Sequence, residues 1–260
     1  MLFSQLVKAN LQTKFLGREI EYYQRLGSTN VEAFELIDKG GIADGTMVIT
    51  DHQFEGKGRQ RRSWFASPGK AVTFSVILRP EISTQQNGLL SLAVGVAVAE
   101  AVEKFGLTPT LKWPNDIRIS GKKCGGALVE TKVQRDSVEY AVVGIGLNVN
   151  ESLNELPEEL RNSATTLSAE KGSPLQRELV VAWILNALER WIDAVKSGKS
   201  VSLRSTWQEK CDHLNKAVAF SNNGENRSGT FSGIGDNGAA LIKTSDDEIS
   251  LTGDEISINV

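Results

Sequence analysis

The sequence contains little cysteine and little histidine, with two residues of each among 260. Cys124 and Cys211 cannot build a disulfide framework, and neither lies in a C-x-x-C pair or at zinc spacing from a histidine. A Ser-His-Asp site is disfavoured by the scarcity of histidine, and the G-x-x-x-x-G-K-[ST], H-E-x-x-H and G-x-S-x-G patterns are all absent. We therefore expect a protein of a reducing compartment, the cytoplasm.

Long apolar runs and an excess of positive charge are lacking too. The longest apolar stretch, residues 89–99, is too short to span a bilayer, and residues 1–17 lack the apolar region of a secretory signal. Lys and Arg total 29 against 32 Asp and Glu, a net charge of −3. This balance argues against a broad surface for nucleic acid, so we expect any anion site to be local and no membrane segment.

The remaining composition is that of a globular protein, with 40% hydrophobic and 23% charged residues. Capping signals predict helices that begin at Thr29 and at Ser173, and a third, buried helix is predicted over residues 89–105. Runs rich in Val, Ile and Phe predict strands over residues 47–50, 71–78, 117–119, 126–131 and 138–149. Because these strands are interleaved with the helices, the pattern predicts an α+β or α/β fold.

The pattern changes near residue 216, where short alternating segments are separated by turn signals at residues 222–224 and 236–238. We therefore divide the chain into a larger domain, residues 1–215, and a small β domain, residues 216–260. Residues 233–238 match the dinucleotide fingerprint G-x-G-x-x-G, but no helical pattern follows them. We interpret them as a hairpin turn.

A basic loop, residues 56–64, is the first candidate for chemistry. It holds four cations, two glycines and a final Trp64. Glycines let backbone N–H groups approach an anion, Arg binds carboxylate or phosphate through two nitrogens, and Trp stacks on a planar base. The alternatives are a solvated basic loop or part of a nucleic-acid groove.

Two further segments carry polar groups at fixed places. Residues 112–116 read Lys-Trp-Pro-Asn-Asp, where the proline restrains the turn and can aim Lys112; a plain surface turn is an equal alternative. Glycines run through the predicted strands at residues 121–126 and 143–150, which marks either bulges or a ligand pressed against the backbone.

Together these patterns resemble the biotin protein ligases, and they occur in that family's order over residues 27–150. The resemblance implies an α+β fold, a mixed sheet flanked by helices of the class II synthetase-like type, followed by a small C-terminal SH3-like β-barrel. The matching segments are Gly27-Ser28-Thr29-Asn30, Gln53, residues 56–64, residues 112–116, residues 121–126 and Gly144-Ile145-Gly146-Leu147-Asn148.

The resemblance also implies a reaction in two steps. Biotin and Mg-ATP give biotinyl-5'-AMP and pyrophosphate, and a lysine of a biotin carboxyl carrier domain then accepts the biotinyl group. Biotin and ATP are thus the expected substrates, Mg²⁺ is expected to bind with ATP through ligands that we do not assign, and the carrier domain is the expected partner. A homodimer is left open.

The site residues implied by the resemblance divide between the two substrates. Lys112 and Arg59 are the expected catalytic residues, because cations stabilise the charge that develops when a carboxylate meets a phosphate. The biotin set is Ser28, Thr29, Asn30, Gln53, Lys57, Gly58, Arg59, Lys112 and Gly126. The nucleotide set is Lys57, Arg59, Trp64, Asn115, Gly144 and Asn148.

The chain departs from the family pattern in the basic loop. Lys57 stands where the family commonly has Arg, which removes a bidentate group, and Gln60-Arg61-Arg62 replaces a common Arg-Gly-Arg. We therefore expect a weaker hold on the anion and a changed loop. The 26 residues before Gly27 are fewer than an independent DNA-binding domain needs, so we expect the monofunctional form and no DNA binding.

Two other functions remain as alternatives. A lipoate or octanoate protein ligase shares the acyl-adenylate chemistry, but an alkyl chain has no use for the polar residues at positions 28–30 and 53. A nucleic-acid-binding module would explain the basic loop and the C-terminal β segments, but the negative net charge disfavours it.

Overall fold

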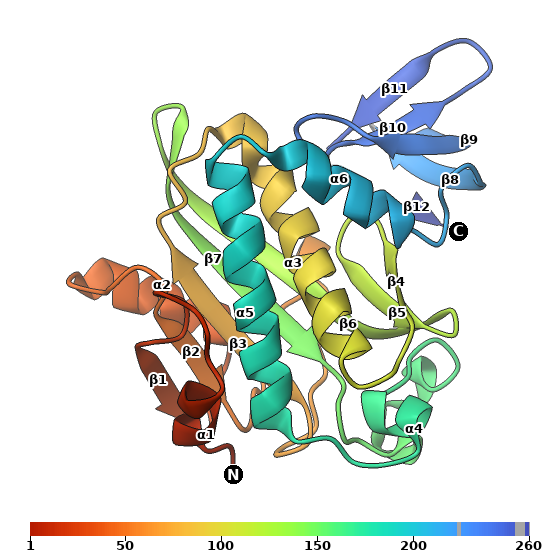
Figure 1. The fold of residues 1–260 in the computed structure, drawn as a ribbon. Helices are drawn as coiled ribbons and strands as arrows, with labels where there is room; N and C mark the ends of the chain where they lie inside the picture. Colours follow the sequence, from red (N-terminus) through yellow and green to blue (C-terminus); the bar gives the residue numbers. More distant parts are fainter. Residues whose placement is uncertain (223–224, 253–257, 260) are drawn as a thin grey trace.

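The computed structural model describes residues 1–222, 225–252 and 258–259. Its centre is a seven-stranded sheet with the order β1-β2-β3-β7-β6-β5-β4, in which β1 and β2 run parallel and the other neighbours run antiparallel (Figure 1). This confirms the mixed sheet. The strands are β1 (Ile20–Tyr23), β2 (Met47–Thr50), β3 (Val72–Leu78), β4 (Pro109–Lys112), β5 (Asp116–Ile119), β6 (Lys122–Gln134) and β7 (Ser137–Leu147).

Helices cover both faces of this sheet. α3 (Asn87–Glu103) and α5 (Arg177–Lys196) lie on one face, and α2 (Thr29–Lys39) packs on the other, against β2, β3 and β7. Alternation along the strands divides the core, since Val76 of β3 belongs to the α3 side and Ile77 to the α2 side. The other helices are α1 (Ser4–Ala9), α4 (Leu167–Lys171), α6 (Ser200–Glu209) and the 3₁₀ turns η1 (Arg59–Arg61), η2 (Thr84–Gln86), η3 (Leu153–Glu155) and η4 (Glu158–Leu160).

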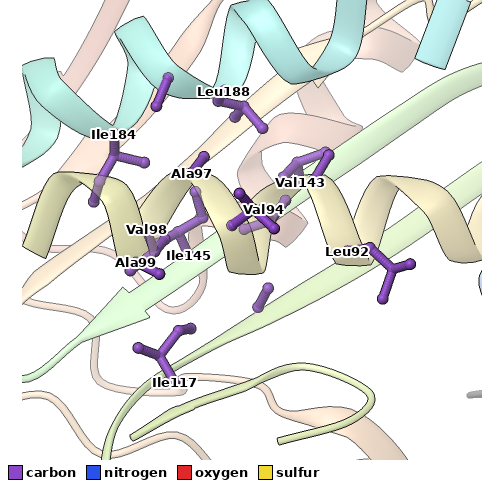
Figure 2. Packing of buried hydrophobic residues seen from close by; sticks show 14 of the residues in the cluster. Leu92, Val94, Ala97, Val98, Ala99, Ile117, Val143, Ile145, Ile184 and Leu188 are labelled. Atoms are coloured by element: carbon purple, nitrogen blue, oxygen red, sulfur yellow. The ribbon is translucent and has the colours of Figure 1, made fainter. Parts of the chain in front are cut away.

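The predicted buried helix is α3, which packs against α5, α6 and the strands β4, β5 and β6. Figure 2 shows its side chains meeting Ile184 and Leu188 of α5 on one side and Val143 and Ile145 of β7 on the other. A helix that is surrounded in this way has almost no solvent face, so its apolar residues show no single stripe. This explains the nearly continuous apolar pattern of residues 89–99.

One helix start and one helix cap differ from the sequence prediction, while α2 begins at Thr29 as predicted. The helix expected at Ser173 begins at Arg177, because Asn150 exchanges two hydrogen bonds with the backbone of Leu175 and holds that segment non-helical. At α2 the cap is Ser28, one residue before the predicted Thr29, and no side-chain cap bond forms. Glu32, expected to complete a capping box, instead accepts a hydrogen bond from the Tyr23 hydroxyl at 2.9 Å.

A second, antiparallel sheet with the order β11-β10-β9-β8-β12 follows α6 (Figure 1). The expected small C-terminal β unit is thereby confirmed. Residues 233–238 cover the end of β9 and most of its turn into β10, residues 235–239, so they form part of a hairpin, as predicted. Of the turn signal at residues 222–224, the last two positions lie outside the described residues. The strands are β8 (Ala217–Asn222), β9 (Glu225–Ile234), β10 (Ala240–Lys243), β11 (Glu248–Leu251) and β12 (Ile258–Asn259).

Sequence patterns did not reveal α1, β1, β4 or α6, which are short or only weakly patterned. None of the helices in the described part of the chain has the length and apolar character that a bilayer crossing requires.

Candidate active site

A cavity of about 380 Å³ opens where the start of α2, the basic loop, the β4–β5 turn and the middle of β6 and β7 meet. Although these segments are up to 120 residues apart in the sequence, the sheet order brings them together. All the site residues predicted from the sequence lie in its wall: Ser28, Thr29, Asn30, Gln53, Lys57, Gly58, Arg59, Trp64, Lys112, Asn115, Gly126, Gly144 and Asn148.

One half of the cavity is a buried polar cluster at the start of α2. The Gln53 side-chain oxygen accepts hydrogen bonds from the backbone N–H of Thr29 at 2.9 Å and from its hydroxyl at 3.2 Å. Ser75 Oγ lies 2.7 Å from Thr29 Oγ1 and 2.6 Å from Asn30 Oδ1. The Asn30 amide donates to Glu130 at 2.7 Å. Such bonds fix the direction of each polar group before a ligand arrives.

Two glycines of β7 make room for the wall. A β-carbon at Gly144 would overlap the Asn30 side chain, and one at Gly146 would lie 2.5 Å from the Trp64 ring. Both distances are shorter than real packing allows. The sequence analysis interpreted these glycines as marks of bulges or of a ligand against the backbone, but at positions 144 and 146 they make room for side chains of the wall. Trp64 packs against β7 because position 146 has no side chain.

The basic loop is folded back on itself. Gly58 N–H donates to the Arg62 carbonyl at 2.7 Å, and Trp64 N–H donates to the Gly56 carbonyl at 2.8 Å. At its tip Gln60 and Arg61 have φ of 54° and 60°, the left-handed region that favours glycine. The replacement of the family's glycine thus leaves a backbone shape that costs about 1 to 2 kcal/mol per residue outside glycine.

The β4–β5 turn supplies the facing wall. Asn115 donates to the Ala127 carbonyl of β6 at 2.6 Å, and its oxygen lies 3.4 Å from Arg59 Nη1, so it connects the sheet to the basic loop. Lys112 is half-buried at the end of β4. Burial lowers the pKa of its ammonium, and the neighbouring Asp116 carboxylate opposes that shift.

Lys123 is a wall residue that the sequence analysis quoted but did not assign to the site. Its Nζ lies 2.5 Å from Asp116 Oδ1 and 5.7 Å from the centre of the Trp64 ring. It brings the cations of the wall to five, with Lys57, Arg59, Arg62 and Lys112. Its place beside the expected biotin residue Gly126, in the quoted segment 121–126, was the signal that could have assigned it.

The sequence analysis also missed Ser75 and the segment after β7. Thr73 and Ser75 alternate with apolar residues along β3, which was the available sign of a polar face. The later segment adds Leu156, Leu160, Ser163 and Ala164 to the wall, and no motif marked it. It is held by β6, because Lys123 N–H donates to the Ser163 carbonyl at 2.9 Å.

The two ends of that segment are joined beside Asn148. The Asn148 amide donates to the Thr165 carbonyl at 3.1 Å, and the Thr166 hydroxyl donates to the Glu151 carbonyl at 3.0 Å. The Glu151 carboxylate is 1% exposed, accepts one hydrogen bond from Val149 N–H at 2.7 Å, and has no partner for its other oxygen among the described residues. Burial raises the pKa of Glu151 to about 7.

The wall residues by themselves do not form a metal site, and they suit a metal ion only when it is bound to a phosphate ligand. Among the described residues no three His, Cys, Asp or Glu side chains gather as metal ligands. The described wall has one carboxylate, Asp116, and Lys123 is paired with it. A cation-rich wall of this kind binds polyphosphate, and Mg²⁺ keeps most of its ligands as phosphate oxygens and water.

Comparison with known proteins agrees with this site. Residues 22–148 match the model of the biotin/lipoate A/B protein ligase family. The chain is 35% identical over 248 residues to the bifunctional ligase/repressor BirA of Bacillus subtilis, an alignment that covers 92% of this chain and 74% of that protein.

Two further relatives support the same grouping. The biotin–[acetyl-CoA-carboxylase] ligase of Mycobacterium tuberculosis is 33% identical over 177 residues, which are 66% of this chain and 63% of that protein. The structure of biotin protein ligase from Aquifex aeolicus in complex with biotin and ATP matches with a TM-score of 0.80 and 27% identity, over 93% of this chain and 99% of that chain. The resemblance noted in the sequence is confirmed, and the chain belongs to the biotin/lipoate A/B protein ligase family, where it groups with the biotin protein ligases.

Proposed function

We propose that the chain is an ATP-dependent biotin ligase that forms biotinyl-5'-AMP and transfers its biotinyl group to a lysine of a biotin carboxyl carrier domain. One observation carries the proposal: a single cavity joins a buried polar cluster to a wall with five cations and one carboxylate. The polar cluster suits an uncharged ureido ring, and the cation-rich wall suits a nucleoside triphosphate. The Aquifex aeolicus relative binds biotin and ATP together.

Biotin occupies the polar half in this proposal. Its ureido ring is a compact set of donors and acceptors, which the oriented groups around Thr29 and Gln53 match, and we place Gly126 of β6 beside it. Gly144 lies against Asn30, so we place it in this half too. The biotin residues are then Ser28, Thr29, Asn30, Gln53, Gly126 and Gly144, with Lys57, Gly58, Arg59 and Lys112 near the carboxylate.

The nucleotide occupies the half that Trp64 faces. The Trp64 ring supports the adenine, and its indole N–H, buried and without a partner among the described residues, is available to a ligand. Asn148 and the Leu156–Leu160 side of the wall enclose the base, while Asn115, Lys57 and Arg59 lie toward the phosphates.

In the first step a carboxylate oxygen of biotin attacks the α-phosphorus of ATP, and the bond to pyrophosphate breaks. Two anionic groups must approach each other, so the preplaced cations Lys112, Arg59 and Lys123 offset their repulsion and stabilise the charge that develops. Mg²⁺ bound to ATP shields the phosphate charge further. Burial makes the Lys112 charge more effective, because fewer water dipoles screen it.

In the second step the neutral amine of the acceptor lysine attacks the acyl carbon of biotinyl-5'-AMP. The bond to the AMP oxygen breaks, AMP leaves with the electron pair, and the amine loses its extra proton to solvent. The basic loop covers the anhydride through Arg59 and keeps water from it. The carrier domain is the partner of this step, and we propose a cytoplasmic location for the reaction.

The competing ligase is tested by substrate choice. We expect biotin to drive exchange of labelled pyrophosphate into ATP, and lipoate or octanoate to fail. An alkyl chain would bury the donor and acceptor sites that the cluster's internal hydrogen bonds leave open, at a cost of about 1 to 3 kcal/mol per group. Equal exchange with lipoate would contradict the proposal. A nucleic-acid module is not favoured, because most of the basic loop's cations line the cavity.

A further inference from the structure

The glycine-rich turn between β9 and β10 contacts the catalytic part of the chain directly. Gly238 has a φ of 86°, and a β-carbon there would lie 2.5 Å from the carbonyl carbon of Gly88 and 2.8 Å from the N of Leu89, at the start of α3. The turn is closed by the Gly235 N–H, which donates to the Ala239 carbonyl at 2.9 Å. Backbone therefore packs on backbone at this point, which leaves little freedom for either side.

The same turn accepts a hydrogen bond from a wall residue of the cavity. Trp113 Nε1 donates to the Gly238 carbonyl at 3.2 Å, and the Trp113 side chain is 2% exposed. An indole N–H that is buried this deeply needs an acceptor, and no acceptor but Gly238 is recorded for it among the described residues. Trp113 lies between Lys112 and Asn115 in the β4–β5 turn.

Other contacts make the β9–β10 turn a fixed support. Arg204 of α6 forms an ion pair with Asp236 at 2.7 Å, and Gln208 of α6 accepts from Ile234 N–H at 2.9 Å. The outer edge of β4 is held as well, since Leu111 N–H donates to the Lys210 carbonyl at 2.8 Å. The β4–β5 turn is thus fixed from its edge and from behind.

We propose that the β9–β10 turn positions the adenylation site: Gly238 holds Trp113, and Trp113 holds Lys112 and Asn115 at the reacting groups. This rests on the proposed function, because it assigns the adenylation step to that wall. A displacement of about 1 Å in a charge-stabilising group can cost about a hundredfold in rate, so a support outside the cavity affects catalysis without touching the substrate. Trp113 and Gly238 are positioning residues.

Two variants break the contact from its two sides. Trp113→Phe keeps an aromatic ring and removes the N–H, and Gly238→Ala adds a methyl group against Gly88. Gly106→Ala is the matched control, because Gly106 also has a positive φ, 78°, but has nothing within 4 Å of a β-carbon and does not line the cavity. It reproduces the backbone strain without the displacement.

The first measurement is independent of activity. The chain has five tryptophans, and the indole N–H signal lost in Trp113→Phe identifies Trp113 in a ¹H–¹⁵N spectrum. We expect this signal to shift in Gly238→Ala and to keep its place in Gly106→Ala. An unshifted signal in Gly238→Ala would overturn the proposed contact, whether or not the chain ligates biotin.

The second measurement is pyrophosphate exchange with biotin. We expect Trp113→Phe and Gly238→Ala each to lower kcat by roughly three- to tenfold, the loss of about one buried hydrogen bond, with less than about twofold change in the KM for biotin. The double variant should be no slower than the slower single variant. The inference would be refuted if the losses of kcat multiplied in the double variant, if only the KM for biotin changed, or if Gly106→Ala lost as much kcat. An inactive wild type would contradict only the proposed function.

Discussion

Gly144 and Gly146 lie two residues apart on β7, on the same face of the strand, yet they leave room for different halves of the cavity. Position 144 faces Asn30, in the polar cluster, and position 146 faces the Trp64 ring. A side chain added at either glycine would therefore disturb only one half of the cavity. This separation allows the two proposed subsites to be tested one at a time.

We expect Gly144→Ala to weaken biotin binding strongly and Gly146→Ala to weaken ATP binding. In the first variant the methyl group pushes Asn30 away from Ser75, and in the second it lifts Trp64 off the strand. Calorimetry with biotin and with ATP measures both effects. The two variants control for each other, and equal loss of both ligands in either one would contradict the division of the cavity.

The two lysines of the wall differ in their surroundings. Lys112 is half-buried, whereas Lys123 is paired with Asp116. We expect Lys112→Ala to slow adenylation about a hundredfold with little change in biotin affinity, since its charge acts on the transition state. Single-turnover formation of biotinyl-5'-AMP and calorimetry measure the two quantities.

Lys123→Ala should in addition raise the KM for ATP, because it leaves the Asp116 carboxylate unpaired and facing the phosphates. Asp116→Asn combined with Lys123→Ala should recover part of that KM, as the repelling charge is then gone. If the double variant binds ATP no better than Lys123→Ala, the ion pair has no part in nucleotide binding.

At the scale of elements, the segment after β7 depends on one buried acid. Its ends meet at Glu151 and Thr166, and its middle supplies Leu156 and Leu160 to the cavity wall. The pKa of Glu151 is raised from 4.5 to about 7. At pH values between these two, Glu151 keeps its proton in the folded protein but has lost it in the unfolded chain. Stability should therefore fall as pH rises from 4.5 through 7.

We expect Glu151→Gln to remove that part of the pH dependence, because the amide oxygen still accepts from Val149 N–H and carries no charge. The gain at pH 8 is at most about 3 kcal/mol, because the pKa of Glu151 is raised from 4.5 to about 7. Urea unfolding at pH 5 and pH 8 measures it, with the exposed Glu159→Gln as the control. An unchanged difference between the two pH values in Glu151→Gln would contradict the assignment.

At the scale of the molecule, the apolar cores of the two sheets are continuous. The fully buried His213 packs against Phe231 with ring centres 4.4 Å apart and the rings inclined at 59°, and Phe231 of β9 packs near Trp207 of α6. Arg118 of β5 also pairs with Asp212, just before the C-terminal sheet, at 2.9 Å. The sequence pattern changes between residues 215 and 216, and we propose that the boundary between the two parts lies there. Because they share a core, we expect the two parts to fold together.

We expect Phe231→Ala to destabilise the whole chain by about 3 to 5 kcal/mol, the usual cost of deleting a buried aromatic ring. Far-ultraviolet circular dichroism and tryptophan fluorescence should report one shared, shifted unfolding transition. Val201→Ala, at a position 68% exposed, is the control. If the fluorescence transition of Phe231→Ala stayed in place while a separate transition in the circular dichroism moved, the two parts would be independent units.

The sequence by itself determined the mixed arrangement of helices and strands, the C-terminal β unit and three of the segments that line the cavity. These follow from short-range physics: apolar periodicity, turn residues, and the polar and glycine patterns at residues 28–30, 56–64 and 112–116, which retain their meaning in any fold that buries them. The G-x-G-x-x-G pattern could be interpreted as a hairpin for the same reason, since local signals on either side were strand-like.

Only the tertiary structure decided what each of these residues contacts. Asn150 moved the start of α5 by holding Leu175, and the strand order brought Lys123 beside Asp116 and Trp64. It also set the β9–β10 turn behind Trp113, about 125 residues away in the chain. Contacts of this kind depend on the packing of whole layers, which no local pattern encodes, because the energy of a side-chain pair is realised only when distant segments meet.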